Sequence, residues 1–462
     1  MEKTTQSRNF GMRDKLGYMF GDFGNDFTFI LSTMFLLKFY TDVMGVSAAL
    51  VGTMMMLARF VDAFTDVTMG QIVDRSKTKA KGKFAPWLRV VCGPVAVASF
   101  LMYATWFKDM PMAFKIFWMF FTYLLWGSVF YTGINIPYGS MASAITADPK
   151  ERAELSTWRT IGGTLASTVI GVIMPLIVYY KNADGQSVLS GTRMTVVAGI
   201  CSVLAVVCYM LCYHMTTERV KMSEINEKFS LIGLFKSIFT NRSLIGIVVA
   251  ALILLVAQMS LQNMTAYVYP NYFGQIEAMS VGSLIYTVIA LLCASFTVKL
   301  SVKIGRKELA IICALLGAGA MGTLYIIHTT NVWVFVLLYQ VAGIGMSIFG
   351  LICWAMITDV IDDTEVKTGA RQDGTIYSVY SFARKCGQAA SSGLAGAMLT
   401  AIGYSQANAF DTVVVNKIYD ITCFVPAVSF LLLAVALWFL YPLNKKTVEA
   451  NAQELARRRG EA

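Results

Sequence analysis

A cluster of charged residues interrupts an apolar stretch near residue 60. The run R-F-V-D-A-F-T-D places Arg59, Asp62 and Asp66 three and four residues apart, so all three lie on one face of a helix. Two carboxylates one turn apart in a medium of low dielectric constant cannot both ionise freely. They share a proton, hold a monovalent cation or pair with Arg59. The alternative is a silent Arg59–Asp62 pair with Asp66 meeting water. We therefore expect a site for Na⁺ or H⁺, with Arg59 as counter-ion or gate.

Two other apolar runs contain oxygen-bearing side chains. In G-D-F-G-N-D-F, Asp22 and Asp26 lie one turn apart, and Asp26 is farther into the apolar run. In Y-T-G-I-N-I-P-Y-G-S, Tyr131, Thr132 and Asn135 supply hydroxyl and amide groups, and the proline leaves a backbone carbonyl without its helical donor. These groups can bind a cation or a sugar. They can also be interfacial carboxylates and helix-packing residues, so the runs alone leave both interpretations open.

Four more residues carry groups that recognise sugars. Arg159 can form a forked hydrogen bond with vicinal hydroxyls or a carboxylate, or can extend to the membrane interface instead. Trp354 can stack on the apolar face of a pyranose, or can anchor a helix at the interface. Arg384 and Lys385 point about 100° apart on a helix, so at most one faces a central cavity directly. We expect that residue to be Lys385.

The run T-D-V-I-D-D-T-E contains Asp359 and is followed by Lys367 and Arg371. Its charges predict a cytoplasmic loop after an apolar segment. We interpret Asp359 and Arg371 as members of a gate of salt bridges, separate from any substrate site.

The composition places these residues in a membrane protein. The 462 residues are 56% apolar and 14% charged, against about 25% charged in soluble domains. A soluble enzyme and a disordered chain are both excluded. The first apolar run follows a polar start and lacks a small-residue cleavage site, so we expect it to stay in the protein. Nine cysteines without a C-x-x-C pair and only two histidines predict free thiols, no haem or zinc, and no cofactor.

A span needs about 20 mostly apolar residues. The sequence contains about twelve such stretches, near residues 17–41, 47–73, 86–107, 112–137, 156–180, 193–214, 243–269, 278–300, 308–328, 332–357, 375–402 and 418–441.

Lysine and arginine predict the orientation, because cytoplasmic loops retain them. One side of the predicted topology holds only five in its loops: Lys108, Lys115, Lys181, Arg193 and Lys417. Both termini are therefore expected in the cytoplasm. The net charge of +10 follows from this topology, so nucleic-acid binding is not needed to explain it.

The longest internal loop divides the spans six and six. The predicted domains are an N-terminal half at 1–215, a linker at 216–241, a C-terminal half at 242–442 and a cytoplasmic tail at 443–462. Weakly similar basic motifs around Arg75 and Arg306 lie half a chain length apart. Two six-helix halves of an all-α membrane protein predict the major facilitator fold, with a substrate site at the membrane midplane.

Several strings, in order along the whole chain, resemble the glycoside-pentoside-hexuronide:cation symporters, a family that includes the melibiose carrier. They are G-D-F-G-N-D-F, Y-T-D-V-M-G, R-F-V-D-A-F-T-D, G-K-F-A-P-W, N-I-P-Y-G-S and Y-S-F-A-R-K-C-G-Q. Two of these strings, N-I-P-Y-G-S and Y-S-F-A-R-K-C-G-Q, look closer to the glucuronide and xyloside carriers.

The resemblance implies roles for individual residues. Asp62 and Asp66 match the cation-site carboxylates, Thr132 matches the hydroxyl that joins them, and Asn135 is assigned to both the cation and the sugar site. The sugar-site positions are Asp26, Asn25, Tyr131, Asn135, Arg159, Trp354 and Lys385. Asn25, Asn135 and Gly139 replace a lysine, an aspartate and a tryptophan of the melibiose carrier, which argues against an α-galactoside.

The expected function is import of a glucuronide, hexuronide, xyloside or pentoside coupled to Na⁺ or H⁺ in a bacterial inner membrane. We expect a monomer in the lipid bilayer that performs no covalent chemistry. Alternatives are a cation-coupled lysolipid carrier, which needs an apolar lateral opening, and a proton-coupled drug exporter. A non-transporting sensor would usually append a soluble domain, for which the tail after Pro442 is short.

Overall fold

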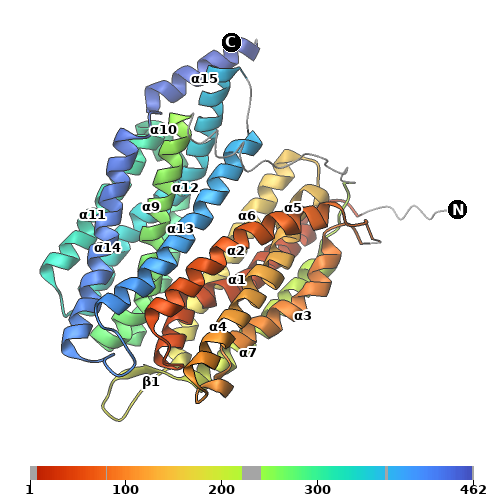
Figure 1. The fold of residues 1–462 in the computed structure, drawn as a ribbon. Coiled ribbons are helices and arrows are strands. Elements are labelled where there is room, and N and C mark those ends of the chain that lie inside the picture. Colours follow the sequence, from red (N-terminus) through yellow and green to blue (C-terminus); the bar gives the residue numbers. More distant parts are fainter. Residues whose placement is uncertain (1–7, 80, 221–240, 370–372, 460–462) are drawn as a thin grey trace. The chain divides into compact units, whose positions relative to one another are not determined.

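The computed structural model describes residues 8–79, 81–220, 241–369 and 373–459. The chain forms two compact units, Met1–Glu227 and Lys228–Ala462, each built almost entirely of helices. The boundary falls inside the range 216–241, most of which lies outside the described residues, so the predicted linker stays a prediction. Figure 1 shows the elements of each unit.

In the first unit, α1 packs along α6 and α7, and α3 packs against α7. The elements are α1 (Met12–Asp42), α2 (Ala48–Asp74), α3 (Ala85–Met102), η1 (Thr105–Phe107), α4 (Met112–Leu124), η2 (Leu125–Tyr131), α5 (Thr132–Ile145), α6 (Pro149–Val178), β1 (Tyr179–Lys181), β2 (Ser187–Leu189) and α7 (Gly191–Met215). The two short strands pair antiparallel, with Tyr180 opposite Val188, and connect α6 to α7.

The fourth predicted span is one long helical segment, Met112–Ile145, that contains a π-helical stretch. This stretch, η2, widens the helix just before Thr132, the first residue of α5. π-Helical turns of this kind are frequent at functional sites because they change the direction of neighbouring side chains. Pro137 lies within α5, one to two turns after the irregular stretch.

In the second unit, α9 packs against α13 and α14, while α11 packs against α12 and α14. The elements are α9 (Arg242–Tyr267), η3 (Val268–Phe273), α10 (Ile276–Ile304), α11 (Arg306–Ile327), α12 (Val332–Thr368), α13 (Asp373–Ala401), α14 (Thr412–Phe439) and α15 (Lys445–Arg459). The terminal helix α15, in the range predicted as a tail, packs against α12.

Ten helical segments among the described residues are long and apolar enough to cross a membrane. The other two long helices, α1 and α13, contain charged residues such as Asp22, Asp26, Arg384 and Lys385. Together these segments are the twelve predicted spans, and the predicted all-helical membrane fold is confirmed.

Two predicted boundaries are wrong. The run that contains Asp359 belongs to α12, which continues to Thr368 and ends where Gly369 adopts a left-handed conformation with φ of 73°. It was expected to be a loop because it is charged, but it contains no glycine or proline that would end a helix. Likewise α6 begins at Pro149, because the Asp148 side chain accepts a hydrogen bond from the backbone N–H of Lys150.

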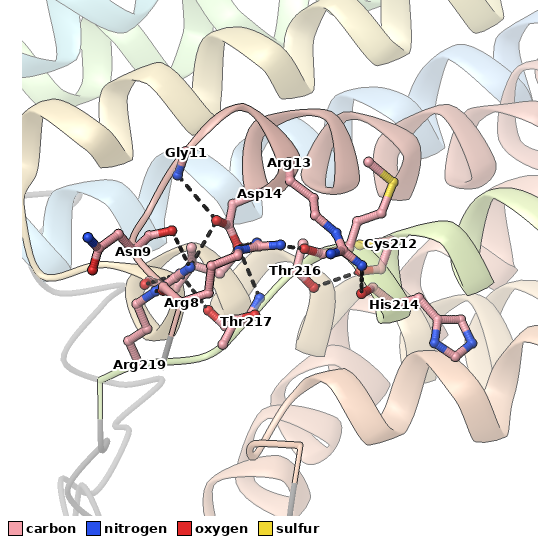
Figure 2. Close-up of polar contacts among 12 residues, drawn as sticks. Arg8, Asn9, Gly11, Arg13, Asp14, Cys212, His214, Thr216, Thr217 and Arg219 are labelled. Atoms are coloured by element: carbon pink, nitrogen blue, oxygen red, sulfur yellow. Dashed lines mark hydrogen bonds and ion pairs between the residues drawn. The ribbon is translucent and has the colours of Figure 1, made fainter. Parts of the chain in front are cut away.

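A polar cluster joins the start of α1 to the segment after α7 (Figure 2). The Asp14 carboxylate is completely buried and accepts contacts from Arg8 at 2.7 Å, from Arg219 at 2.9 Å and from the backbone N–H of Thr217 at 3.1 Å. The Arg219 guanidinium also donates to the Ile145 carbonyl oxygen at 3.2 Å, which lies at the end of α5. One carboxylate therefore organises three helix ends.

The neighbouring Glu218 extends this cluster to α3. Its carboxylate accepts hydrogen bonds from the backbone N–H groups of Lys83, Phe84 and Ala85 at 2.7, 2.9 and 2.6 Å. These donors lie at the start of α3, where a helix leaves its first N–H groups without internal partners and favours negative charge. Residues 217–219 thus tie the ends of α5 and α7 to the starts of α1 and α3.

Asp14→Asn should lower the melting temperature of the purified protein clearly, because it leaves two guanidinium groups beside a buried neutral amide. Breaking a buried ion pair costs about 3 kcal/mol or more. Arg457→Gln is the matched control, since that arginine pairs with Glu454 on an exposed surface. Equal melting temperatures for the two variants would contradict the role assigned to Asp14.

Candidate cation and sugar sites

Asp62 is buried in α2, and each of its carboxylate oxygens has a partner. Arg59, one turn earlier, donates from Nη1 to Oδ2 at 3.2 Å. The Ser128 hydroxyl of η2 donates to Oδ1 at 2.6 Å. The Arg59 guanidinium also lies over the ring of Phe29 in α1, 5.1 Å from its centroid. The pair therefore joins α2 to η2 and α1.

Asp66, one turn after Asp62, is half-buried and contacts the same neighbouring segment. Its Oδ1 accepts a hydrogen bond from the Thr132 hydroxyl at 2.8 Å. Thr132 also lies 3.2 Å from the carbonyl oxygen of Gly127. Ser128 and Thr132 are four residues apart, as are Asp62 and Asp66. Each hydroxyl therefore contacts one of the two carboxylates.

The sequence reasoning did not include Ser128. The sequence does contain a signal for Ser128, because its hydroxyl lies one turn before Thr132, the same spacing as that of Asp62 and Asp66. The chemistry of this cluster is that of hard oxygen ligands: two carboxylates, two hydroxyls and a backbone carbonyl. Such a set can accept a proton or a small monovalent cation once Arg59 or one of the hydroxyls moves away from its carboxylate.

A second charged cluster in the same unit contains Asp22, Asp26 and Arg159. Arg159 donates from Nε to Asp22 Oδ1 at 2.9 Å, and its guanidinium lies 5.3 Å from the centroid of the Tyr138 ring. The predicted sugar site included Asp26 and omitted Asp22, which the structure pairs with Arg159. Arg159 is the eleventh residue of α6, deeper than the helix start at which it was expected.

Gly163 of α6 makes room for both aspartates. A Cβ atom at this position would lie 2.7 Å from Asp26 Oδ2 and 3.1 Å from Asp22 Oδ2. Because Gly163 has no side chain, α6 leaves space for the carboxylates of Asp22 and Asp26 of α1. Two acids and one arginine meet there within a few ångströms.

The predicted residues Asn25 and Asn135 form a neutral cluster. Asn25 Nδ2 donates to Asn135 Oδ1 at 3.3 Å, and the Tyr209 hydroxyl of α7 donates to Asn25 Oδ1 at 2.8 Å. Tyr131 packs against the rings of Phe29 and Trp126, with centroids 5.7 and 5.3 Å apart. Tyr209 was not predicted, since one polar group in an apolar helix gives no signal by itself.

In the second unit, Trp354 of α12 lies within an aromatic and cationic group from α13. Its ring is stacked on Tyr377 at 6.4 Å and meets Tyr380 edge-on at 5.3 Å. The guanidinium of Arg384 lies 5.4 Å from the indole centroid. The sequence predicted that Lys385, and not Arg384, faces a central cavity; the structure places Arg384 against Trp354. A role for Lys385 stays a prediction.

Asp359, one of the predicted gate residues, lies in α12. Asp359 is buried in an ion pair with Arg306, the first residue of α11. Asp363, one turn later, contacts Lys367 at 2.6 Å and the Ser243 hydroxyl at 2.7 Å. These contacts hold α9, α11 and α12 together. Arg371, the other predicted gate residue, lies outside the described residues.

Comparison with known proteins shows the family of this chain. Residues 17–445 match the family described as MFS/sugar transport protein. The chain belongs to this family. It is 32% identical over 455 residues to the uncharacterized symporter YjmB of Bacillus subtilis, with 97% of this chain and 96% of the relative covered. The predicted resemblance to the glycoside-pentoside-hexuronide:cation symporters is confirmed.

Two further relatives have names that describe their substrates. The glucuronide carrier protein homolog of Escherichia coli is 30% identical, with coverage of 98% of this chain and 97% of the relative. The isoprimeverose transporter of Lactiplantibacillus pentosus is 29% identical, with 94% and 89% covered. Both are similar to this chain over nearly its whole length.

Solved structures confirm the major facilitator fold. A bacterial homolog of the human lysosomal transporter Spinster has a TM-score of 0.69 at 12% identity, covering 96% of this chain and 99% of that chain. The D-xylose-proton symporter has a TM-score of 0.61 at 15% identity, covering 93% and 97%. At such low identity the likeness concerns the fold alone.

Gly163→Ala should reduce transport about tenfold, because its methyl group would press on Asp26 and Asp22, and overpacking costs about 1–3 kcal/mol. The measurement is initial uptake rate at matched amounts of protein in the membrane. Gly139→Ala is the control, since its Cβ would meet only Arg159 at an ordinary 4.0 Å. Similar losses in both variants would argue against a site at Asp22 and Asp26.

Proposed function

We propose that the protein is a secondary active symporter that imports a sugar or glycoside together with Na⁺ or H⁺. The observation that carries this proposal is the pair Asp62 and Asp66, placed inside a membrane-long helix and contacted by the hydroxyls of Ser128 and Thr132. Ionisable groups inside a membrane span are costly and usually mark ion or substrate pathways. Membership of a sugar-transport family supplies the substrate class.

In this proposal the coupling cation binds at Asp62 and Asp66. Thr132 and Ser128 orient the two carboxylates, Arg59 is the counter-ion of Asp62 before loading, and Asn135 is a further cation ligand. Cation binding raises the affinity for the sugar, and linkage requires the sugar to raise the affinity for the cation by the same factor. Alternating access then exposes the loaded sites to one side of the membrane and afterwards to the other.

The sugar contacts are proposed for polar and aromatic residues of both units. In the first unit they are Asp22, Asp26, Arg159, Asn25, Asn135 and Tyr131. In the second unit they are Trp354 and Lys385. Relatives named for a glucuronide and for isoprimeverose support a glucuronide, hexuronide or pentoside as substrate class.

We propose a bacterial inner-membrane location. The distribution of lysine and arginine supports an orientation with both termini in the cytoplasm. The working unit in this proposal is a monomer, and no resident cofactor takes part. Asp359 and its ion pair with Arg306 are proposed to hold the helix ends of the second unit in one conformational state, as a gate.

Uptake into membrane vesicles tests the proposal. We expect labelled glucuronides, hexuronates or xylosides to accumulate when a Na⁺ or H⁺ gradient is imposed, and not when the gradient is collapsed. A vesicle that accumulates lysolipid, or that expels cationic drugs in exchange for protons, would instead support one of the alternative carriers. Failure of every sugar under both gradients would overturn the proposal.

Asp66→Asn should abolish gradient-driven accumulation, because the neutral amide cannot exchange a proton and lacks the negative charge that holds a cation. The same substitution at Asp184 is the matched control, since that residue lies exposed in the loop between β1 and β2. Accumulation is measured over time with the gradient present. Wild-type accumulation by Asp66→Asn would rule out this carboxylate as the coupling site.

A further inference from the structure

Arg384 lies deep within α13. It comes eleven residues after Asp373, the first residue of the helix, and seventeen before Ala401, the last. At a rise of about 1.5 Å per residue, the helix extends about 16 Å on one side and about 26 Å on the other. A guanidinium at this depth cannot reach the headgroups at either membrane surface as easily as one near a helix end. It needs a partner within the membrane.

The arginines at comparable depth in the first unit have such partners. Arg59 pairs with Asp62 at 3.2 Å, and Arg159 pairs with Asp22 at 2.9 Å. Among the residues that the structure describes, Arg384 makes no ion pair with a carboxylate. The groups around it are neutral: the indole of Trp354, the phenol of Tyr380 and the thiol of Cys353. Its positive charge is therefore not balanced within this cluster.

The cluster is also open on one side. Arg384 is half-buried, and Trp354 and Tyr377 are 47% and 41% exposed within the chain. Lipid tails cannot solvate a guanidinium, so the open side is expected to face water or a bound ligand. The guanidinium carbon of Arg384 lies over the Trp354 ring at 5.4 Å from its centroid, a cation–π distance. The N–H groups at the edge of the guanidinium can then bind another group in a forked arrangement.

We propose that Arg384 binds the anionic substituent of an acidic sugar, a carboxylate or a sulfonate, while Trp354 contacts the apolar face of the sugar ring. This inference rests on the proposed sugar symport and narrows its substrate class. The anion supplies the negative charge that the described residues of the second unit do not place beside Arg384. A planar guanidinium matches the two oxygens of a carboxylate, and this match gives both affinity and orientation. Neutral sugars of the same size leave the guanidinium without that partner.

The test compares two glycosides that share one aglycone, phenyl glucuronide and phenyl glucoside, in the wild type and in Arg384→Gln. For the wild type we expect a KM for the glucuronide well below that for the glucoside. Arg384→Gln should raise the glucuronide KM about tenfold or more, as expected for the loss of a charged hydrogen bond, and should leave the glucoside KM within about threefold. Arg384→Lys, which keeps the charge without the fork, should fall between them.

The glucoside serves as the internal control for folding, because a misfolded variant would lose both activities. Arg457→Gln, which removes an exposed arginine, should change neither KM. An equal loss of both glycosides in a normally folded Arg384→Gln, or equal KM values for them in the wild type, would overturn the anion-binding role alone. If the wild type transports neither sugars nor sugar acids under any gradient, the proposed function itself fails. A sulfonated glycoside in the same assay distinguishes carboxylate from sulfonate as the preferred anion.

Discussion

A charge buried within a membrane-spanning helix is unfavourable by several kcal/mol unless an opposite charge or a set of hydrogen bonds lies beside it. The helix contacts of the first unit satisfy this requirement. Arg59 holds Asp62 on α2, Ser128 and Thr132 bring η2 and α5 to that same face, and Arg159 brings α6 to α1 through Asp22. The packing of these helices and the chemistry of the site are therefore set by the same contacts.

The irregular parts of the helices serve this arrangement. The π-helical stretch η2 contains Ser128 and ends just before Thr132. The helix is therefore irregular at the point where these two hydroxyls contact Asp62 and Asp66. Gly163 provides the corresponding space on α6, where a side chain would collide with Asp26. Asp14 and Glu218 connect the ends of α5 and α7 to the starts of α1 and α3.

The two units differ in how their charges are balanced. In the first, acids and arginines occur together: Arg59 pairs with Asp62, and Arg159 pairs with Asp22. In the second, Arg384 lies beside aromatic rings, and the carboxylates of α12 are engaged elsewhere, Asp359 with Arg306 and Asp363 with Lys367. A cation in an uncharged aromatic setting is suited to an anionic ligand, whereas paired acids are suited to a coupling ion. The division gives each unit a distinct part in the proposed transport.

The sequence by itself determined the membrane-spanning character, the twelve helices and the shared face of Arg59, Asp62 and Asp66, because apolar length and helical spacing are local properties. Its strings also gave the family. Only the tertiary structure decided that Asp22, Tyr209 and Arg384 join these clusters, since each meets its partner across a helix contact and no spacing within one helix encodes that meeting. It also showed that α12 continues through Asp359, whose buried carboxylate pairs with Arg306 of α11.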